Sequence, residues 1–112
     1  MTRRTRTTIL VPTTGYNEKN TDALRAQVEA DLLATFGAFT QEPTVYGVWR
    51  EDSTGWVWRD QLVPYWVDHE GREEDHEYLR TVAEMVRKRA RQIAVYMYHE
   101  VVHVELVKAP AA

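Results

Sequence analysis

The 112-residue sequence predicts a ferredoxin-like α+β domain, a two-layer sandwich in which both helices cover one face of an antiparallel sheet. Strand-like and helix-like segments follow one another in the order strand, helix, strand, strand, helix, strand. The two central strand segments are joined by a short polar turn that is typical of a β-hairpin. The composition, with 44% hydrophobic and 28% charged residues, fits one globular domain over residues 1–112.

The first part of the domain is predicted to hold one strand and one helix. Residues 7–13 are rich in β-branched side chains, and Pro12 and Gly15 end this strand. The helix that follows ends at Gly37, a residue that favours helix C-termini. Its apolar residues fall four apart on one face: Leu24, Val28, Leu32 and Phe36.

The middle of the chain is predicted to form a β-hairpin. Residues 44–50 and 56–69 are rich in β-branched and aromatic side chains, and residues 51–55 between them form a polar turn that ends in glycine. Pro64 lacks a backbone N–H, so we expect the second strand to bend or to lie at an edge there.

Residues 73–92 carry the clearest helical pattern. Apolar residues recur three and four apart, the first turns are acidic and the last turns are basic, which suits the helix dipole. Residues 94–107 have the composition of a final strand. We expect residues 1–6 and 108–112, which lie outside these segments, to be flexible.

The sequence excludes several classes of protein. It has no cysteine, so disulfides and thiolate chemistry are absent. No segment has the length of a membrane span or the pattern of a secretory signal, and we expect a cytoplasmic protein without a membrane partner. The net charge of −3 makes nucleic acid an unlikely partner.

The string His99-Glu100-Val101-Val102-His103 matches the HExxH pattern of zinc hydrolases, which requires a helix. The β-branched composition of this region predicts a strand instead. On a strand, residues four apart are separated by roughly 13 Å, too far to bind one ion. We therefore assign no catalytic residue, no metal ligand and no cofactor, and a zinc-dependent hydrolase stays as an alternative.

Aromatic residues are the main candidates for binding. Four Trp and six Tyr are a surplus for so short a chain, and such side chains fill cores or contact surfaces. The sequence leaves open whether they face the helices or the bare side of the sheet. The candidate binding residues are Tyr46, Trp49, Trp56, Trp58 and Trp66.

Charged clusters suggest two further possibilities. Arg3, Arg4 and Arg6, beside an aromatic sheet, leave a single-stranded RNA-binding module as a second alternative, although no RNP1-type pattern is present. The run 68–77 holds six carboxylates and two histidines, and metal binding there is conceivable. We interpret this run as a solvated loop that leads into the second helix.

Part of the pattern resembles a group of short hypothetical proteins from bacteria and their phages. In that group an FGG-x-T helix end precedes a G-x-W strand, a turn, and a last strand that opens with Q-x-x-V. The matching segments here are Phe36-Gly37-Ala38-Phe39-Thr40, Gly47-Val48-Trp49 and Gln92-Ile93-Ala94-Val95. The resemblance covers roughly residues 8–98, implies the same fold and a phage or mobile-element origin, and carries over no catalytic residue.

These observations predict a small non-catalytic binding or assembly domain. A single layer of helices leaves one sheet face bare, and we expect a second copy of the chain to cover it, giving a homo-oligomer. The ligand, the protein partner and the number of copies stay open. A cavity enzyme formed between two subunits is a further alternative.

Overall fold

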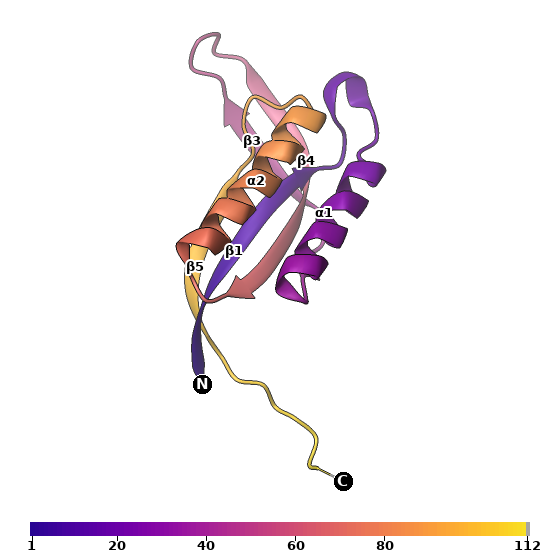
Figure 1. Ribbon diagram of the computed structural model, residues 1–112. Helices are drawn as coiled ribbons and strands as arrows, with labels where there is room; N and C mark the ends of the chain where they lie inside the picture. Colours follow the sequence, from indigo (N-terminus) through magenta and orange to yellow (C-terminus); the bar gives the residue numbers. More distant parts are fainter. Residues whose placement is uncertain (112) are drawn as a thin grey trace.

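Five strands form one antiparallel sheet and two helices pack on one of its faces in the computed structural model, which describes residues 1–111 (Figure 1). The predicted ferredoxin-like sandwich is thereby confirmed. A short 3-10 helix, Tyr16–Glu18, precedes the first α-helix. The other elements are β1 (Thr2–Pro12), α1 (Asp22–Phe36), β2 (Thr40–Gln41), β3 (Val45–Arg50), β4 (Val57–His69), α2 (Glu73–Arg89) and β5 (Met97–Val104).

Strand β1 lies in the middle of the sheet, between β4 and β5. The register places Ile9 opposite Tyr65 on one side and opposite Met97 on the other. Strand β4 is long enough to pair with two short strands along its far edge. Its first half pairs with β3 and its second half pairs with β2.

The core lies between the sheet and the helices. Alternate residues of β1 point towards the helices, among them the buried Ile9 and Val11. The predicted apolar stripes of both helices are buried against this face. The core residues are Ile9, Val11, Leu24, Val28, Leu32, Val63, Tyr65, Val67, Leu79, Val82, Ala83, Val86 and Ala90.

One tyrosine links the core to helix α1. The hydroxyl of the buried Tyr65 donates a hydrogen bond of 2.8 Å to Oε2 of Glu29. Burial raises the pKa of Tyr65, and the hydrogen bond to Glu29 adds to the effect. The phenol therefore stays neutral and anchors α1 to the sheet.

The chain start differs from the sequence prediction. Residues 2–6 were expected to be flexible, yet they extend β1 and pair with β5. Arg6 explains how a basic segment joins the sheet, because its guanidinium bonds Asp68 at 2.8 Å and lies 3.6 Å from the ring centre of Trp66. Residues 105–111 follow β5 without regular secondary structure, and Ala112 lies outside the described residues.

The acidic run also differs from its interpretation as a solvated loop. Asp68 and His69 belong to β4, only residues 70–72 form a turn, and Glu73 begins α2. His69 is buried. Over the described part of the chain, neither helix is long and apolar enough to cross a membrane.

Candidate functional site

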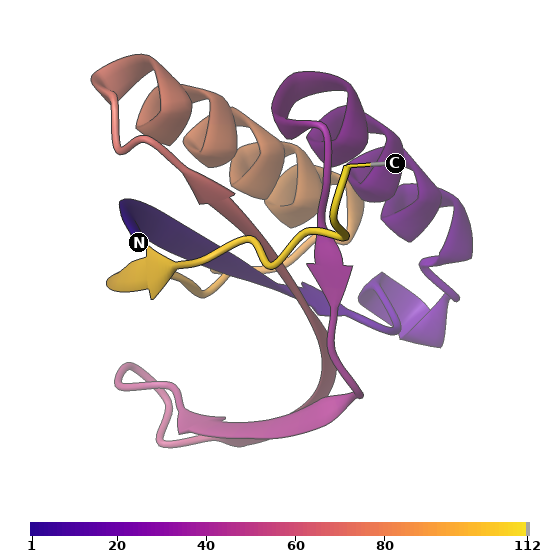
Figure 2. The same ribbon diagram turned by 90° about the horizontal axis from the view of Figure 1, so that it is seen from below.

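The hairpin formed by β3 and the first half of β4, residues 45–61, projects beyond the helices, and we call it the arm (Figure 1). Seen from below, the arm curls away from the helices and passes beneath the bare face of the sheet (Figure 2). Residues 57–60 run past the last paired residue of β1, so their strand partner in the described structure is β3. The arm therefore offers a free strand edge together with its side chains.

Three predicted binding residues gather on the arm. The rings of Trp49 and Trp58 are stacked with centroids 6.2 Å apart, and Trp56 lies 6.4 Å from Trp58. Each stacked indole donates its N–H to a carboxylate, Trp49 to Asp60 at 3.0 Å and Trp58 to Glu51 at 3.3 Å. All three rings remain exposed, with Trp56 at 63%. An apolar cluster so open to water is typical of an interaction surface.

Trp49 also borders a cavity of about 450 Å³ on the bare face of the sheet. The register places Leu10, Leu62 and Trp49 on this face, because their neighbours Ile9 and Val63 point into the core. The segment that connects α2 to β5 closes the far side. The lining is mostly apolar: Leu10, Pro12, Gly47, Val48, Trp49, Asp60, Leu62, Gln92, Ala94, Val95 and Tyr96.

The other two predicted binding residues lie apart from this group. Tyr46 points to the opposite face of the arm and accepts a hydrogen bond from Gln61 at 3.0 Å. Trp66 lies on the bare face farther along β4, where the Arg6 guanidinium covers its ring. The five predicted residues therefore divide into one cluster and two separate positions.

The sequence did not single out the aromatic residue on the far side of the cavity. Tyr96 is 67% exposed, borders the cavity opposite the arm, and packs against Tyr98 with ring centroids 5.8 Å apart. The sequence placed Tyr96 in the predicted final strand, residues 94–107. Its proximity to Trp49 depends on how far the arm curls, which local composition does not determine.

Three histidines lie together on the helix-facing side of the sheet. The sequence drew attention to the two in the run 68–77 but not to their contact with the third. His69 ends β4, His76 lies in the first turns of α2, and His99 lies in β5. One ring nitrogen from each lies within 4.8 Å of the others. The rings of His69 and His76 meet edge to face at 5.2 Å, and those of His76 and His99 at 4.7 Å.

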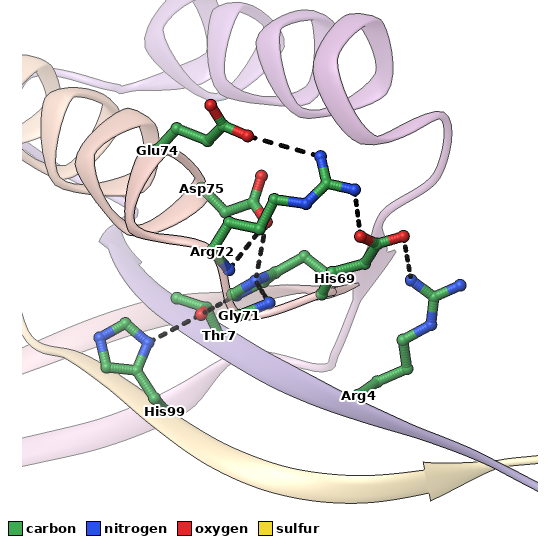
Figure 3. Close-up of polar contacts among 9 residues, drawn as sticks. Arg4, Thr7, His69, Gly71, Arg72, Glu74, Asp75 and His99 are labelled. Atoms are coloured by element: carbon green, nitrogen blue, oxygen red, sulfur yellow. Dashed lines mark hydrogen bonds and ion pairs between the residues drawn. The ribbon is translucent and has the colours of Figure 1, made fainter.

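Thr7 joins two of these histidines across the central strand (Figure 3). Its hydroxyl lies 2.7 Å from Nε2 of His69 and 2.7 Å from Nδ1 of His99. Burial lowers the pKa of His69, against the opposing attraction of Asp75. Partial desolvation of its ring likewise lowers the pKa of His99, and neighbouring His76 adds to the shift.

The string of residues 99–103 is part of β5, as predicted, so the helical HExxH geometry is not formed. His99 and Glu100 point to opposite faces, since His99 pairs with Thr7 and Glu100 with Arg6. The zinc-hydrolase alternative that rests on this string is therefore wrong.

No protein-family model matches the chain, and no curated protein matches it in sequence. Solved structures do match. A phage SAM lyase in complex with S-methyl-5′-thioadenosine superposes with a TM-score of 0.59 at 14% identity, over 87% of this chain and 80% of the lyase. A phage SAM lyase in the apo state gives 0.60 at 10% identity, over 95% and 92%.

The divalent cation tolerance protein CutA1 from Thermus thermophilus superposes with a TM-score of 0.55 at 12% identity, over 97% of this chain and 88% of CutA1. At such low identity these likenesses establish the fold alone. The chain is a ferredoxin-like α+β domain of the same general architecture as a phage lyase and CutA1.

Proposed function

We propose that this chain is a non-catalytic binding domain that self-associates through its arm and takes a flat aromatic molecule of nucleoside size into the cavity beneath it. The observation that carries the proposal is the exposed Trp cluster on a curled arm that borders an apolar cavity. The proposal has two parts, assembly and ligand binding, and each has its own test.

Assembly is supported by the exposed apolar side chains and the unpaired strand edge of the arm. Apolar side chains on both of its faces are exposed, among them Val48 at 57%, Val57 at 53% and Trp56 at 63%. The free strand edge of residues 57–60 adds unpaired backbone groups beside them. A second copy of the chain can pair with this free edge and cover these apolar side chains, because it carries the same edge and the same apolar surface.

Ligand binding is supported by the shape and chemistry of the cavity. Its volume of about 450 Å³ lies in the range of small-molecule sites. Trp49 and Tyr96 supply aromatic surfaces on which a planar base can stack. The carboxylate of Asp60 accepts from the indole of Trp49 with one oxygen, Oδ2. Its second oxygen, which has no hydrogen-bond partner within the described part of the chain, can accept from the hydroxyls of a sugar.

The choice of a nucleoside is supported by the phage SAM lyase, which shares the fold and was solved with S-methyl-5′-thioadenosine. The single-stranded RNA alternative has less support, because Arg6 already bonds Asp68 and Arg87 already bonds Glu84. A phage or mobile-element origin, as the sequence resemblance implies, belongs to the same proposal, and the neighbouring genes would test it.

The assembly part is tested by light scattering of the purified protein. We expect a mass that is a multiple of the 13.1 kDa chain, and a lower mass for the Trp56→Ser, Val57→Ser double variant. Leu33→Ser is the matched control, because Leu33 is an exposed apolar residue on the outer side of α1. A monomeric wild type, or an equal loss of mass in the control, contradicts assembly through the arm.

The ligand part is tested by calorimetric titration with S-methyl-5′-thioadenosine. We expect binding in the wild type and at least about tenfold weaker binding in Asp60→Ala, since a lost charged hydrogen bond costs about 1.5–3 kcal/mol. Asp52→Ala in the exposed turn of the arm is the control. Absence of binding contradicts this part, and conversion of added SAM to S-methyl-5′-thioadenosine contradicts the non-catalytic part.

A further inference from the structure

We infer that His69, His76 and His99 form a Zn²⁺ site at the end of the sheet next to the first turn of α2. Neither the aromatic arm nor its cavity takes part in this site. The three histidines come from β4, α2 and β5, and the fold brings together one nitrogen of each within 4.8 Å. Three imidazoles are a ligand set that suits zinc and leaves a fourth position for water or another ligand.

The distances fit a site that closes around the ion. Zinc–nitrogen bonds of 2.0–2.1 Å in a tetrahedral site place ligand nitrogens about 3.4 Å apart. The nitrogens here must therefore approach one another by at most about 1.4 Å. His69 is buried and serves as the fixed member. His76 is half-buried and His99 is exposed, so both have room to rotate towards it.

A chain of hydrogen bonds sets the tautomers of the metal-free site (Figure 3). The backbone N–H of Gly71 donates to Nδ1 of His69 at 3.0 Å, so the proton of a neutral His69 resides on Nε2. Nε2–H then donates to the hydroxyl of Thr7, and the hydroxyl donates to Nδ1 of His99. Both imidazoles are thus held neutral, the form that binds metal.

The Thr7 hydroxyl competes with an ion for two of the three ligand nitrogens. It lies 2.7 Å from both Nε2 of His69 and Nδ1 of His99, between the two rings. When zinc replaces this hydroxyl, Nε2 of His69 gives up its proton to solvent and Nδ1 takes one from solvent. The ring stays neutral, and no net proton is released from it.

Asp75 is placed to stabilise that second tautomer. Its Oδ2 lies 3.6 Å from Nδ1 of His69, and it is the nearest carboxylate to this nitrogen among the described ion pairs. A histidine that binds zinc through one nitrogen commonly donates its other N–H to a carboxylate. The turn that carries Gly71 must shift for this to occur, since the Gly71 N–H then loses its acceptor. Asp75 is thus a positioning residue and not a ligand.

The site explains one His of the string at residues 99–103. His99 is a ligand together with two histidines from distant parts of the chain. His103 lies on the same face of β5 but opposite Arg3, four residues from His99 and outside the cluster. His103 is therefore a matched control, with the same side chain, the same strand and the same face.

Titration of metal-free protein with Zn²⁺ alone, followed by calorimetry and elemental analysis, tests the site. We expect one Zn²⁺ per chain in the wild type and in His103→Ala, and at least tenfold weaker binding in His76→Ala and His99→Ala. Co²⁺ in place of zinc should give the visible absorption of a four-coordinate ion. These two substitutions avoid the buried His69, and circular dichroism checks that each variant is folded.

Two further variants separate this site from adventitious binding. We expect Asp75→Asn to weaken zinc binding about 10- to 100-fold. Thr7→Ala should bind zinc at least as tightly as the wild type, because no side-chain group then stands between Nε2 of His69 and Nδ1 of His99. No zinc binding by the wild type, equal binding by all variants, or a loss confined to His103→Ala would each overturn the inference.

Discussion

Single residues determine how the turn before α2 is built. Gly71 has a φ of +78°, and a Cβ at this position would lie 2.7 Å from the hydroxyl oxygen of Thr5. Its N–H holds Nδ1 of His69. Glycine is needed here both for the left-handed backbone and for the close approach of β1.

Alanine substitution at two glycines tests this requirement. Gly37 at the end of α1 has nearly the same φ, +79°, but nothing lies within 4 Å of its missing Cβ. We expect Gly37→Ala to lower the free energy of unfolding by about 1–2 kcal/mol, the usual cost of a left-handed alanine. Gly71→Ala should lower it further because of the contact with Thr5. Equal losses in urea denaturation would show that the contact costs nothing.

The histidine cluster also shows what single residues could not reveal from the sequence. His69 and Thr7 are 62 positions apart, and His99 and Thr7 are 92 apart, so no spacing motif marks them. The sequence predicted the order of the elements along the chain, and the structure adds that β4 and β5 lie on either side of β1. The missing information was the register, which is fixed by the alternation of Ile9, Tyr65 and Met97 against the core.

At the scale of the elements, the sequence predicted helix α2 because two patterns indicate the same helix. One is its apolar stripe, and the other is the change from acidic first turns to basic last turns. Its stripe residues Leu79, Val82 and Val86 are all buried. The sequence did not predict the start of β1, because a segment with Arg3, Arg4 and Arg6 has the composition of a charged, flexible tail. Arg6 bonds Asp68 on β4, and Arg4 lies beside Glu70 in the turn after β4. Local periodicity predicts an element well when its own residues form the core, and poorly when distant residues neutralise its charges.

Val86 offers a test at the scale of helix α2. It is fully buried beneath the sheet, whereas Thr81 on the same helix faces solvent. We expect Val86→Asp to unfold the domain or to lower its unfolding free energy by several kcal/mol, because an unpaired carboxylate would enter the core. Thr81→Asp should change the melting temperature little. Similar melting temperatures for the two variants would mean that the helix buries another face.

At the scale of the whole molecule, the two faces of the sheet carry different features. The helix-facing side carries the core and the histidine cluster. The bare side carries the cavity, and the arm extends the sheet beyond the helices (Figure 2). The sequence predicted the aromatic surplus and one bare face. It could not predict which residues share the cavity, because the curl of the arm brings Trp49 to Tyr96.

The character of the proposed assembly can be tested by changing salt. The arm exposes several apolar side chains, among them Tyr46 at 74%, Trp56 at 63% and Val48 at 57%. Screening acts on charges and leaves apolar burial in place, so we expect the oligomer mass to persist as ionic strength rises. A mass that falls to the monomer at high salt would instead indicate contacts between charged side chains. Light scattering across a salt series distinguishes these results.

The central position of β1 determines the order in which the chain can fold. This strand is made first during synthesis, yet it pairs with β5 at a register that joins Thr2 to Val104. Its partners are among the most distant in the sequence, and loops of such length must close before either edge of β1 is satisfied. The pairing of β3 with residues 57–62 of β4 is local in sequence and can form early. A ribosome must therefore release β5 before both edges of β1 are paired, and we expect folding to be slower than that of a helical bundle of the same length.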